Sequence, residues 1–239
     1  MTAEILYCGD PHGVFEQINQ AAIRRSPDAM VLLGDFELDR PLHEAVAAAR
    51  SASEIWWIAG NHDSGSVTQF DALYASALAG HDLHGRVVDI AGVRHAGLGG
   101  HFQGRIWWGQ KPAREARFAT RAAFLERCGK GNIWRGGLPL GRRLAIFPED
   151  IEALAGLRTD VLVCHEAPSS HRHGFGVIDE LARTMGASLI VHGHQHEDYT
   201  ARLPGGIEVL GVGLAGVACP RAGFIVPGRT SRTREPARP

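Results

Sequence analysis

The sequence has no long apolar segment, no basic leader and no surplus of charge. Its apolar runs stop well short of the roughly 18 consecutive residues that a membrane-spanning helix needs. The opening residues, MTAEILYCGD, contain no basic side chain, which argues against a signal peptide. The formal net charge is −1, so the protein as a whole is not attracted to nucleic acid or to a membrane surface. We therefore expect a cytoplasmic protein with no membrane partner.

Cysteine and lysine are both scarce. The four cysteines, Cys8, Cys128, Cys164 and Cys219, are far apart and form no CxxC pair. We expect reduced, mostly buried thiols, and neither a disulfide framework nor a structural zinc site. Only 2 of the 25 basic residues are lysines. Because arginine is abundant along the whole chain, its general excess is not by itself a functional signal.

The N-terminal quarter alternates between short apolar runs and amphipathic stretches. Buried strands are expected at 4–8, 29–34 and 54–60, and helices at 13–25 and 41–52. This β-α-β-α-β order predicts an α/β fold with a parallel sheet and right-handed crossovers.

Further elements are expected downstream. A hairpin is predicted over 86–98, strands over 160–165 and 188–193, a helix over 177–186 and a second hairpin over 199–212. With 239 residues, the chain is long enough for one large domain, or for one domain with a sizeable insertion.

Residues 100–147 do not follow this alternation of predicted strands and helices. We expect an insertion or lobe there, with one helix over 112–127, inside a domain that spans 1–228. The stretch 105–143 carries ten Lys or Arg against two Glu, together with three Trp. These side chains could hold an extended anionic substrate, or could form a solvated helix face over a small tryptophan core. Residues 229–239 are rich in Pro and Arg, so we expect a disordered tail.

Polar side chains gather where each predicted parallel strand ends. In an open α/β sheet the binding site lies outside the carboxyl ends of the strands, so these clusters are expected to converge on one edge. Each cluster alone has an ordinary explanation, such as a helix cap at Asp10 or a turn at Asn61, but their joint occurrence favours a site. In chain order the clusters are Asp10 and His12, then Asp35, then Asn61, His62 and Asp63, then His165, and finally His192, His194 and His196.

The side chains of these clusters suit divalent metals. Carboxylates, imidazoles and one amide are ligands for Mn, Fe or Zn, and no thiolate cluster accompanies them. The set is too large for one octahedral ion. Two ions that share a bridging carboxylate fit better, and such pairs, roughly 3.5–4 Å apart, clamp the attacking and leaving oxygens of a phosphoryl displacement. We expect Mn as the cofactor, with Fe, Zn, Ni or Co as alternatives.

The ordered motifs resemble the calcineurin-like metallophosphoesterase superfamily. They read Asp10-Pro11-His12, Gly34-Asp35, Gly60-Asn61-His62-Asp63, His165 and Gly193-His194-Gln195-His196, and they span residues 10–196. The resemblance implies a two-sheet β-sandwich flanked by helices, arranged αββα, with two metals at its edge. It also implies a hydrolase, in which a metal-bound hydroxide attacks the phosphorus of a phosphate ester.

The resemblance further implies a role for each matching position. His62 would stabilise the phosphoryl oxygens or protonate the leaving group, and Asp63 would orient it. His192 has no role in the family pattern, and we interpret it as a structural residue at a strand end. The implied ligands are Asp10, His12, Asp35 and His196 for one metal, and Asp35, Asn61, His165 and His194 for the other.

The substrate is less well determined than the reaction. Phosphoserine/threonine phosphatases of this superfamily carry GDxVDRG, whereas this chain has GDFELDRP, with Asp39-Arg40 one residue late. Arg40 is therefore either a substrate contact or a solvated residue. His171 and His173 follow the cluster at His165 and are further candidates for substrate binding.

Three classes of function remain open. The preferred one is a phosphoesterase that acts on a phosphorylated small molecule or a phosphoprotein, including a serine/threonine-type protein phosphatase or a dinucleoside polyphosphate hydrolase. A nuclease on this fold is the second, although the near-zero net charge does not favour nucleic acid. A non-catalytic scaffold is the third.

Overall fold

Two β-sheets pack face to face in the computed structural model, which describes residues 3–229. The first sheet has the order β11-β10-β1-β2-β3 and comprises β1 (Ile5–Cys8), β2 (Ala29–Leu32), β3 (Glu54–Trp57), β10 (Val217–Cys219) and β11 (Gly223–Val226). The second sheet has the order β4-β5-β6-β7-β9-β8 and comprises β4 (Val87–Ile90), β5 (Val93–Leu98), β6 (Val161–Cys164), β7 (Leu189–His192), β8 (Tyr199–Arg202) and β9 (Glu208–Gly211).

Parallel strands form the centre of both sheets. β1, β2 and β3 run parallel in the first, and β5, β6, β7 and β9 run parallel in the second. Alternate residues of a strand enter different cores: Ile5 and Tyr7 pack between the sheets, whereas Leu6 and Cys8 pack against helices. Burial on both faces explains why these strands are continuous apolar runs.

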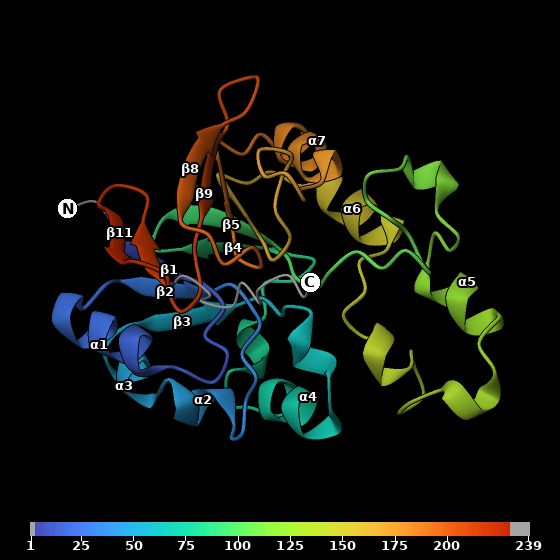
Figure 1. The fold of residues 1–239 in the computed structure, drawn as a ribbon, viewed down its shortest axis with the longest axis horizontal. Coiled ribbons are helices and arrows are strands. Elements are labelled where there is room, and N and C mark those ends of the chain that lie inside the picture. The colour runs from blue at the N-terminus through green and yellow to red at the C-terminus, as the bar shows by residue number, and fades with distance from the viewer. Residues whose placement is uncertain (1–2, 230–239) are drawn as a thin grey trace, which may run out of the picture.

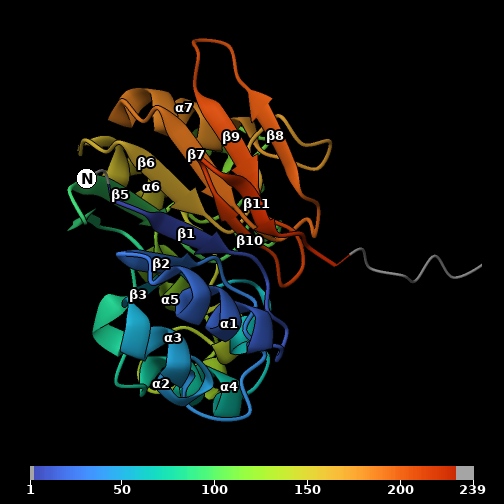
Figure 2. The same ribbon diagram turned by 90° about the vertical axis from the view of Figure 1, so that its left-hand side faces the viewer.

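Helices cover the outer face of each sheet, so the layers are helix, sheet, sheet and helix (Figure 2). The first sheet is covered by α1 (Glu16–Arg25), α2 (Leu42–Ala45), α3 (Ala47–Ala52) and α4 (Val67–Tyr74). The second is covered by α6 (Pro148–Ala155) and α7 (Gly176–Met185). This confirms the predicted αββα class. Among residues 3–229, no helix is long and apolar enough to cross a membrane.

Two predicted helices are divided. The helix expected over 41–52 is interrupted at Val46, whose φ of −107° and ψ of 27° separate α2 from α3. The helix expected over 112–127 is wrong: a short 3-10 turn at Ala113–Glu115 is followed by extended chain, and α5 (Arg121–Glu126) starts only after Thr120. The Thr120 hydroxyl accepts the N–H of Ala123 and so begins this helix.

The predicted lobe at 100–147 stands beside the sandwich and carries α5 (Figure 1). It contains short 3-10 turns and isolated bridges in place of long elements. Trp107 is buried and packs edge-on against Phe102, whereas Trp108 is exposed. The tail predicted to be disordered, 229–239, lies outside the described residues except for Arg229. All four cysteines are free thiols, as expected.

Candidate metal centre

The predicted clusters meet at one edge of the sandwich, between the carboxyl ends of the two sheets. Loops after β1, β2 and β3 supply residues from the first sheet, and loops after β6 and β7 supply those from the second. Three side chains illustrate the convergence. The Nε2 atom of His165 lies 3.0 Å from Asn61 Oδ1 and 3.4 Å from Asp35 Oδ1.

Asp10 and the two C-terminal histidines complete the group. Asp10 Oδ1 lies 3.7 Å from Nδ1 of His165, and Asp10 Oδ2 accepts the backbone N–H of His194 at 2.8 Å. The Nε2 atoms of His12 and His196 face each other at 3.2 Å. The structure therefore brings all seven predicted ligands together: Asp10, His12, Asp35, Asn61, His165, His194 and His196.

The backbone at these positions adopts the sparsely populated left-handed region. Such conformations cost free energy in residues other than glycine, and they persist where surrounding structure enforces them. Here they turn the chain directly after a strand, so that the side chain points into the edge. Positive φ values occur at Asp10 (24°), His12 (41°), Asp35 (54°), His194 (69°) and His196 (54°).

Glycines in the motifs leave room for the ligand side chains. A Cβ atom on Gly60 would lie 2.2 Å from Asp35 Oδ1, and one on Gly193 would lie 2.8 Å from Asp10 Oδ1. Both distances are shorter than real Cβ contacts, so any larger residue would displace the carboxylates. The motif glycines are therefore required by the packing of the centre.

Two features of the donor set fit a divalent cation. Nδ1 of His165 pairs with the backbone carbonyl of Leu33 at 2.7 Å, which directs Nε2 into the centre, as in metal-binding histidines. Asp10 Oδ1 is buried and has no hydrogen-bond partner among the described residues. Burial raises the pKa of Asp10 to about 8, so a nearby cation is the partner that would keep this carboxylate charged at neutral pH.

The histidines of the centre differ in their charge. Burial, followed by the nearby His165, lowers the pKa of His194 to about 3, so this imidazole is neutral and suited to metal binding. Burial opposes charge on His165 as well, but the Asp35 carboxylate outweighs it and raises the pKa of His165 to about 10. Asp35, His165 and His194 offer donor atoms within 4.8 Å of one another, as a shared cation requires.

Asp63 does not orient His62, so that expectation is wrong. The buried Asp63 carboxylate accepts three backbone N–H groups, from Asp35 (3.0 Å), Phe36 (2.7 Å) and Gly60 (2.7 Å). These bonds occupy its oxygens and join the loops that follow β2 and β3. Asp63 therefore supports the backbone beneath the centre.

Glu37 is the carboxylate that faces His62, and the sequence analysis missed it. Its Oε1 lies 2.8 Å from Nδ1 of His62 and 3.0 Å from Nδ1 of His12. The side chain of His62 is 48% exposed, so its other nitrogen is accessible from solvent. The available signal was the spacing, because Glu37 follows Asp35 by two residues in GDFELDRP, closer to Asp35 than Asp39-Arg40.

Glu166 is a second residue that was missed. Its Oε2 lies 3.5 Å from Nε2 of His194, and its Oε1 accepts the N–H of Phe102 at 3.2 Å. The side chain is buried, and burial raises its pKa to about 7. Glu166 directly follows His165, so it links a predicted ligand to the first residues of the lobe.

Among the described residues, no hydrogen bond or ion pair joins Arg40, His171, His173 or His192 to the seven predicted ligands. Arg40 forms an ion pair with its neighbour Asp39 (3.5 Å), and the Arg40 side chain is 52% exposed. His171 and His173 lie in the loop after β6. Nε2 of His171 lies 3.5 Å from Oε2 of Glu197, and Nε2 of His173 accepts the Nε–H of Arg172. His192 is buried, and its Nε2 pairs with the hydroxyl of Tyr199 at 2.7 Å.

Three comparisons relate the chain to known proteins. A family model described as calcineurin-like phosphoesterase matches residues 3–198. An uncharacterized protein of Haemophilus influenzae is 39% identical over 222 residues, which cover 93% of this chain and 96% of that protein. The protein TT1561 of Thermus thermophilus superposes with a TM-score of 0.57 at 15% identity, covering 93% of this chain and 96% of that one. A dimetal phosphatase from Danio rerio superposes with a TM-score of 0.55 at 11% identity, covering 91% and 92%. At these identities, the two solved structures show a shared fold.

Proposed function

Because the chain belongs to the calcineurin-like phosphoesterase family, we propose that it hydrolyses phosphate esters at a centre of two divalent metal ions. The observation that carries this proposal is the convergence of carboxylate, imidazole and amide donors around Asp10 Oδ1, a buried oxygen with no described hydrogen-bond partner. Burying such a set costs free energy unless a bound cation compensates its charge.

The proposed ligands fall into two groups that share one carboxylate. Asp35 would bridge, since its two oxygens face different histidines: Oδ1 faces His165 (3.4 Å) and Oδ2 faces His12 (3.9 Å). When bound, the metals would supply an activated water and neutralise the phosphoryl oxygens. One group is Asp10, His12, Asp35 and His196, and the other is Asp35, Asn61, His165 and His194.

His62 is proposed as the residue that faces the substrate. Glu37 holds Nδ1, so Nε2 remains free to donate a proton to the leaving oxygen or a hydrogen bond to the phosphoryl group. The backbone N–H of His62 donates to Asp35 Oδ1 at 2.8 Å, which couples its position to the proposed bridge. Glu37 is a positioning residue, since it acts through His62 and through its contact with His12.

Mn is the proposed metal, with Fe, Zn, Ni or Co as alternatives, because nitrogen- and oxygen-rich sites accept all of these ions. A phosphorylated small molecule is the proposed substrate, ahead of a phosphoprotein. Free thiols at Cys8, Cys128, Cys164 and Cys219 favour a reducing compartment such as the cytoplasm.

The test is hydrolysis by the protein reconstituted with Mn²⁺, compared with the same protein after chelation. p-Nitrophenyl phosphate, bis-p-nitrophenyl phosphate and a phosphopeptide would be assayed side by side. We expect turnover that chelation abolishes and Mn²⁺ restores, and the preferred ester distinguishes a monoesterase, a diesterase and a protein phosphatase. Absence of turnover from all three, with metal content verified, would contradict the proposal as stated and favour a scaffold.

A further inference from the structure

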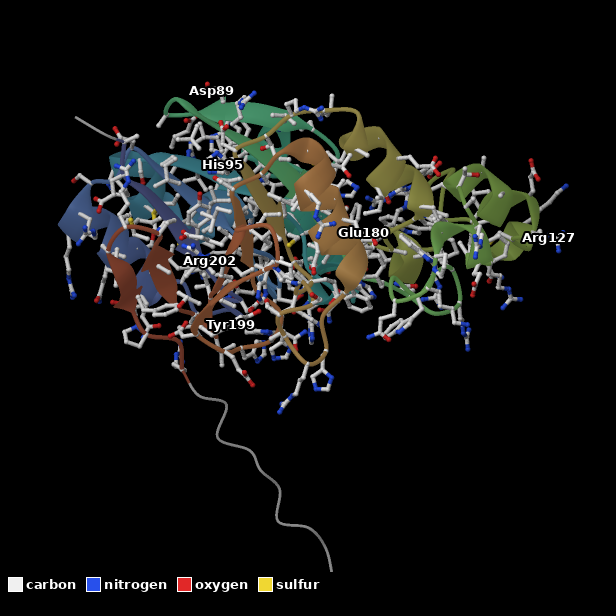
Figure 3. The ribbon with its side chains drawn as sticks, turned by 90° about the horizontal axis from the view of Figure 1, so that it is seen from above. Asp89, His95, Arg127, Glu180, Tyr199 and Arg202 are labelled. Carbon is white, nitrogen blue, oxygen red and sulfur yellow. The ribbon has the colours of Figure 1, made fainter. Side chains whose placement is uncertain are left out.

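Two adjoining hollows connect the candidate metal centre to the lobe. The first, of about 560 Å³, begins at Asn61 and continues along Gln103. The second, of about 540 Å³, lies farther out and is lined in part by Arg117 and Arg127. Arg105, Gly141 and Arg142 line both hollows, so the two form one tract. Figure 3 places Arg127 at the outer end of the lobe, away from the sheets.

The arginine tract, defined by Arg105, Arg117, Arg127 and Arg142, is electrostatically one-sided. No carboxylate lines either hollow. Among residues 3–229, none of these four arginines forms an ion pair. Four guanidinium groups without an ion pair around a concave surface create a positive local field in a protein whose net charge is only −1.

Two other arginines of the lobe, Arg121 and Arg135, have carboxylate partners, unlike those of the tract. Arg121 pairs with Asp150 (2.7 Å) and Glu149 (2.9 Å), and so ties the start of α5 to α6. Arg135 pairs with Asp71 of α4 at 2.5 Å. Arg121 and Arg135 therefore attach the lobe to the sandwich, whereas the four arginines of the tract line the hollows.

Arg142 is held in place from the side of the centre. Its Nη1 donates to Gln103 Oε1, while the amide nitrogen of Gln103 donates to the carbonyl of Gly141 (3.1 Å) and lies 2.9 Å from His101 Nε2. This pattern determines the orientation of the Gln103 amide, because the opposite orientation would set its oxygen against the Gly141 carbonyl and its NH₂ group against the Arg142 guanidinium. A pre-positioned guanidinium loses less entropy when it binds an anion.

We propose that the arginine tract binds further phosphate groups of the substrate, so that the natural ester is a small molecule with more than one phosphate. This inference rests on the proposed phosphoesterase function, which places the first phosphate at the metal centre. Guanidinium groups bind phosphate through paired, charge-assisted hydrogen bonds. Two compact hollows suit a short, multiply charged molecule, whereas a long nucleic acid requires a broad basic face.

A binding experiment tests the tract independently of catalysis. Inorganic tripolyphosphate would be titrated into the full-length, chelator-treated protein by calorimetry, so that no metal can hold the probe. We expect binding by the wild type, weakened by at least about tenfold in Arg142→Ala and in the double variant Arg117→Ala/Arg127→Ala. Arg142→Lys keeps the positive charge but loses the paired N–H donors of the guanidinium group. Its affinity for tripolyphosphate should therefore lie between those of the wild type and Arg142→Ala. Circular dichroism would verify that each variant is folded.

The matched control removes two arginines elsewhere. Arg50 of α3 and Arg183 of α7 are exposed, have no described ion pair and lie outside both hollows. Arg50→Ala/Arg183→Ala changes the net charge as much as the double tract variant does. We expect it to bind tripolyphosphate as the wild type does, so equal weakening in this control would overturn the tract as a specific site.

A second measurement separates this inference from the proposed function. With Mn²⁺ bound, kcat/KM would be compared between p-nitrophenyl phosphate and a nucleoside diphosphate for the wild type and Arg142→Ala. We expect the preference for the diphosphate to fall by about tenfold in the variant. If the protein hydrolyses simple esters but does not bind tripolyphosphate, the proposed role of the arginine tract is wrong and the proposed phosphoesterase function is retained. Tripolyphosphate binding that depends on the tract, without hydrolysis of any ester, would support an anion site and refute the function.

Discussion

The metal-centre edge and the lobe use opposite means to present charge. At the edge, Asp10, Asp35 and His165 are buried, and the loops that follow the strands of two sheets hold ligand residues at positive φ. In the lobe, arginines are mostly exposed and extend from short turns and one short helix. A centre that must hold ions at fixed distances needs the rigid strands, whereas a surface that contacts a substrate through long side chains does not.

The attachment of the two regions also differs. The strands at the edge are fixed by three apolar clusters, two of which lie against helices and one between the sheets. The lobe adds to the second of these clusters and is further held by the ion pairs of Arg121 and Arg135. We therefore expect changes at the edge to abolish the reaction, and changes at the base of the lobe to affect stability.

The largest effect is expected from Asp35→Asn. Asp35 faces histidines with both of its oxygens, so its loss should lower the occupancy of both metals and reduce kcat by about a thousandfold or more. Metal analysis and steady-state kinetics measure the two effects. Asp39→Asn in the same loop is the control, because the described ion pair of the Asp39 side chain is with Arg40 and not with a residue of the centre. Normal activity in Asp35→Asn would show that Asp35 does not bridge two metals.

A smaller loss is expected from His62→Ala. This variant should retain its metals, because His62 lies outside the proposed ligand set, while kcat falls by about a thousandfold at most. Metal content and kcat on p-nitrophenyl phosphate would be determined on the same preparation. Loss of metal from this variant would show that His62 is a ligand and that the division between ligands and substrate-facing residues is wrong.

Glu37→Gln should reduce kcat at saturating metal by on the order of a hundredfold, because Glu37 orients His62, whereas its contact with the proposed ligand His12 should affect metal binding instead. At saturating metal, the double variant Glu37→Gln/His62→Ala should then be no worse than His62→Ala alone. Glu44→Gln, an exposed glutamate in α2, is the control. Additive losses in the double variant would mean that Glu37 acts independently of His62.

The smallest effect concerns the stability of the lobe at low pH. Burial raises the pKa of Asp150, but His84 and Arg121 outweigh it and lower the pKa to about 2. A depressed pKa stabilises the folded state above the unfolded value near 3.8, and this contribution, about 2 kcal/mol, is lost as the pH falls from about 4 to 2.

Denaturant unfolding of the wild type and Asp150→Asn at pH 6, and at several values from about pH 4 down to about pH 2, measures this contribution. The difference in unfolding free energy between the two proteins should be largest at pH 6 and should shrink as the pH falls. A difference that does not depend on pH would show that the charge of Asp150 does not support the lobe.

The sequence predicted the parts of the molecule that follow from periodicity. Apolar runs that end in polar clusters placed β1, β2, β3, β6 and β7, and the carboxyl ends of parallel strands necessarily meet at an edge. The helix expected over 112–127 failed for a physical reason: Thr120 competes as a helix cap, and the N–H groups of Arg117 and Phe118 bond to the carbonyl of Ile106. Propensity alone does not reveal such long-range partners.

The same distinction applies to the proposed site, where some features were predictable from the sequence and others depended on the tertiary structure. Residue types and their order determined by themselves that Asp10, Asp35, Asn61 and His165 would share one edge, because each lies within four residues of the end of a strand. Only the tertiary structure decided which carboxylate faces His62, because Glu37 and Asp63 are equally close to the motifs in the chain, and the backbone N–H groups of two loops capture Asp63. Only the tertiary structure likewise separated the paired arginines of the lobe from those that face the hollows, since a charge acquires a partner only when distant segments pack together.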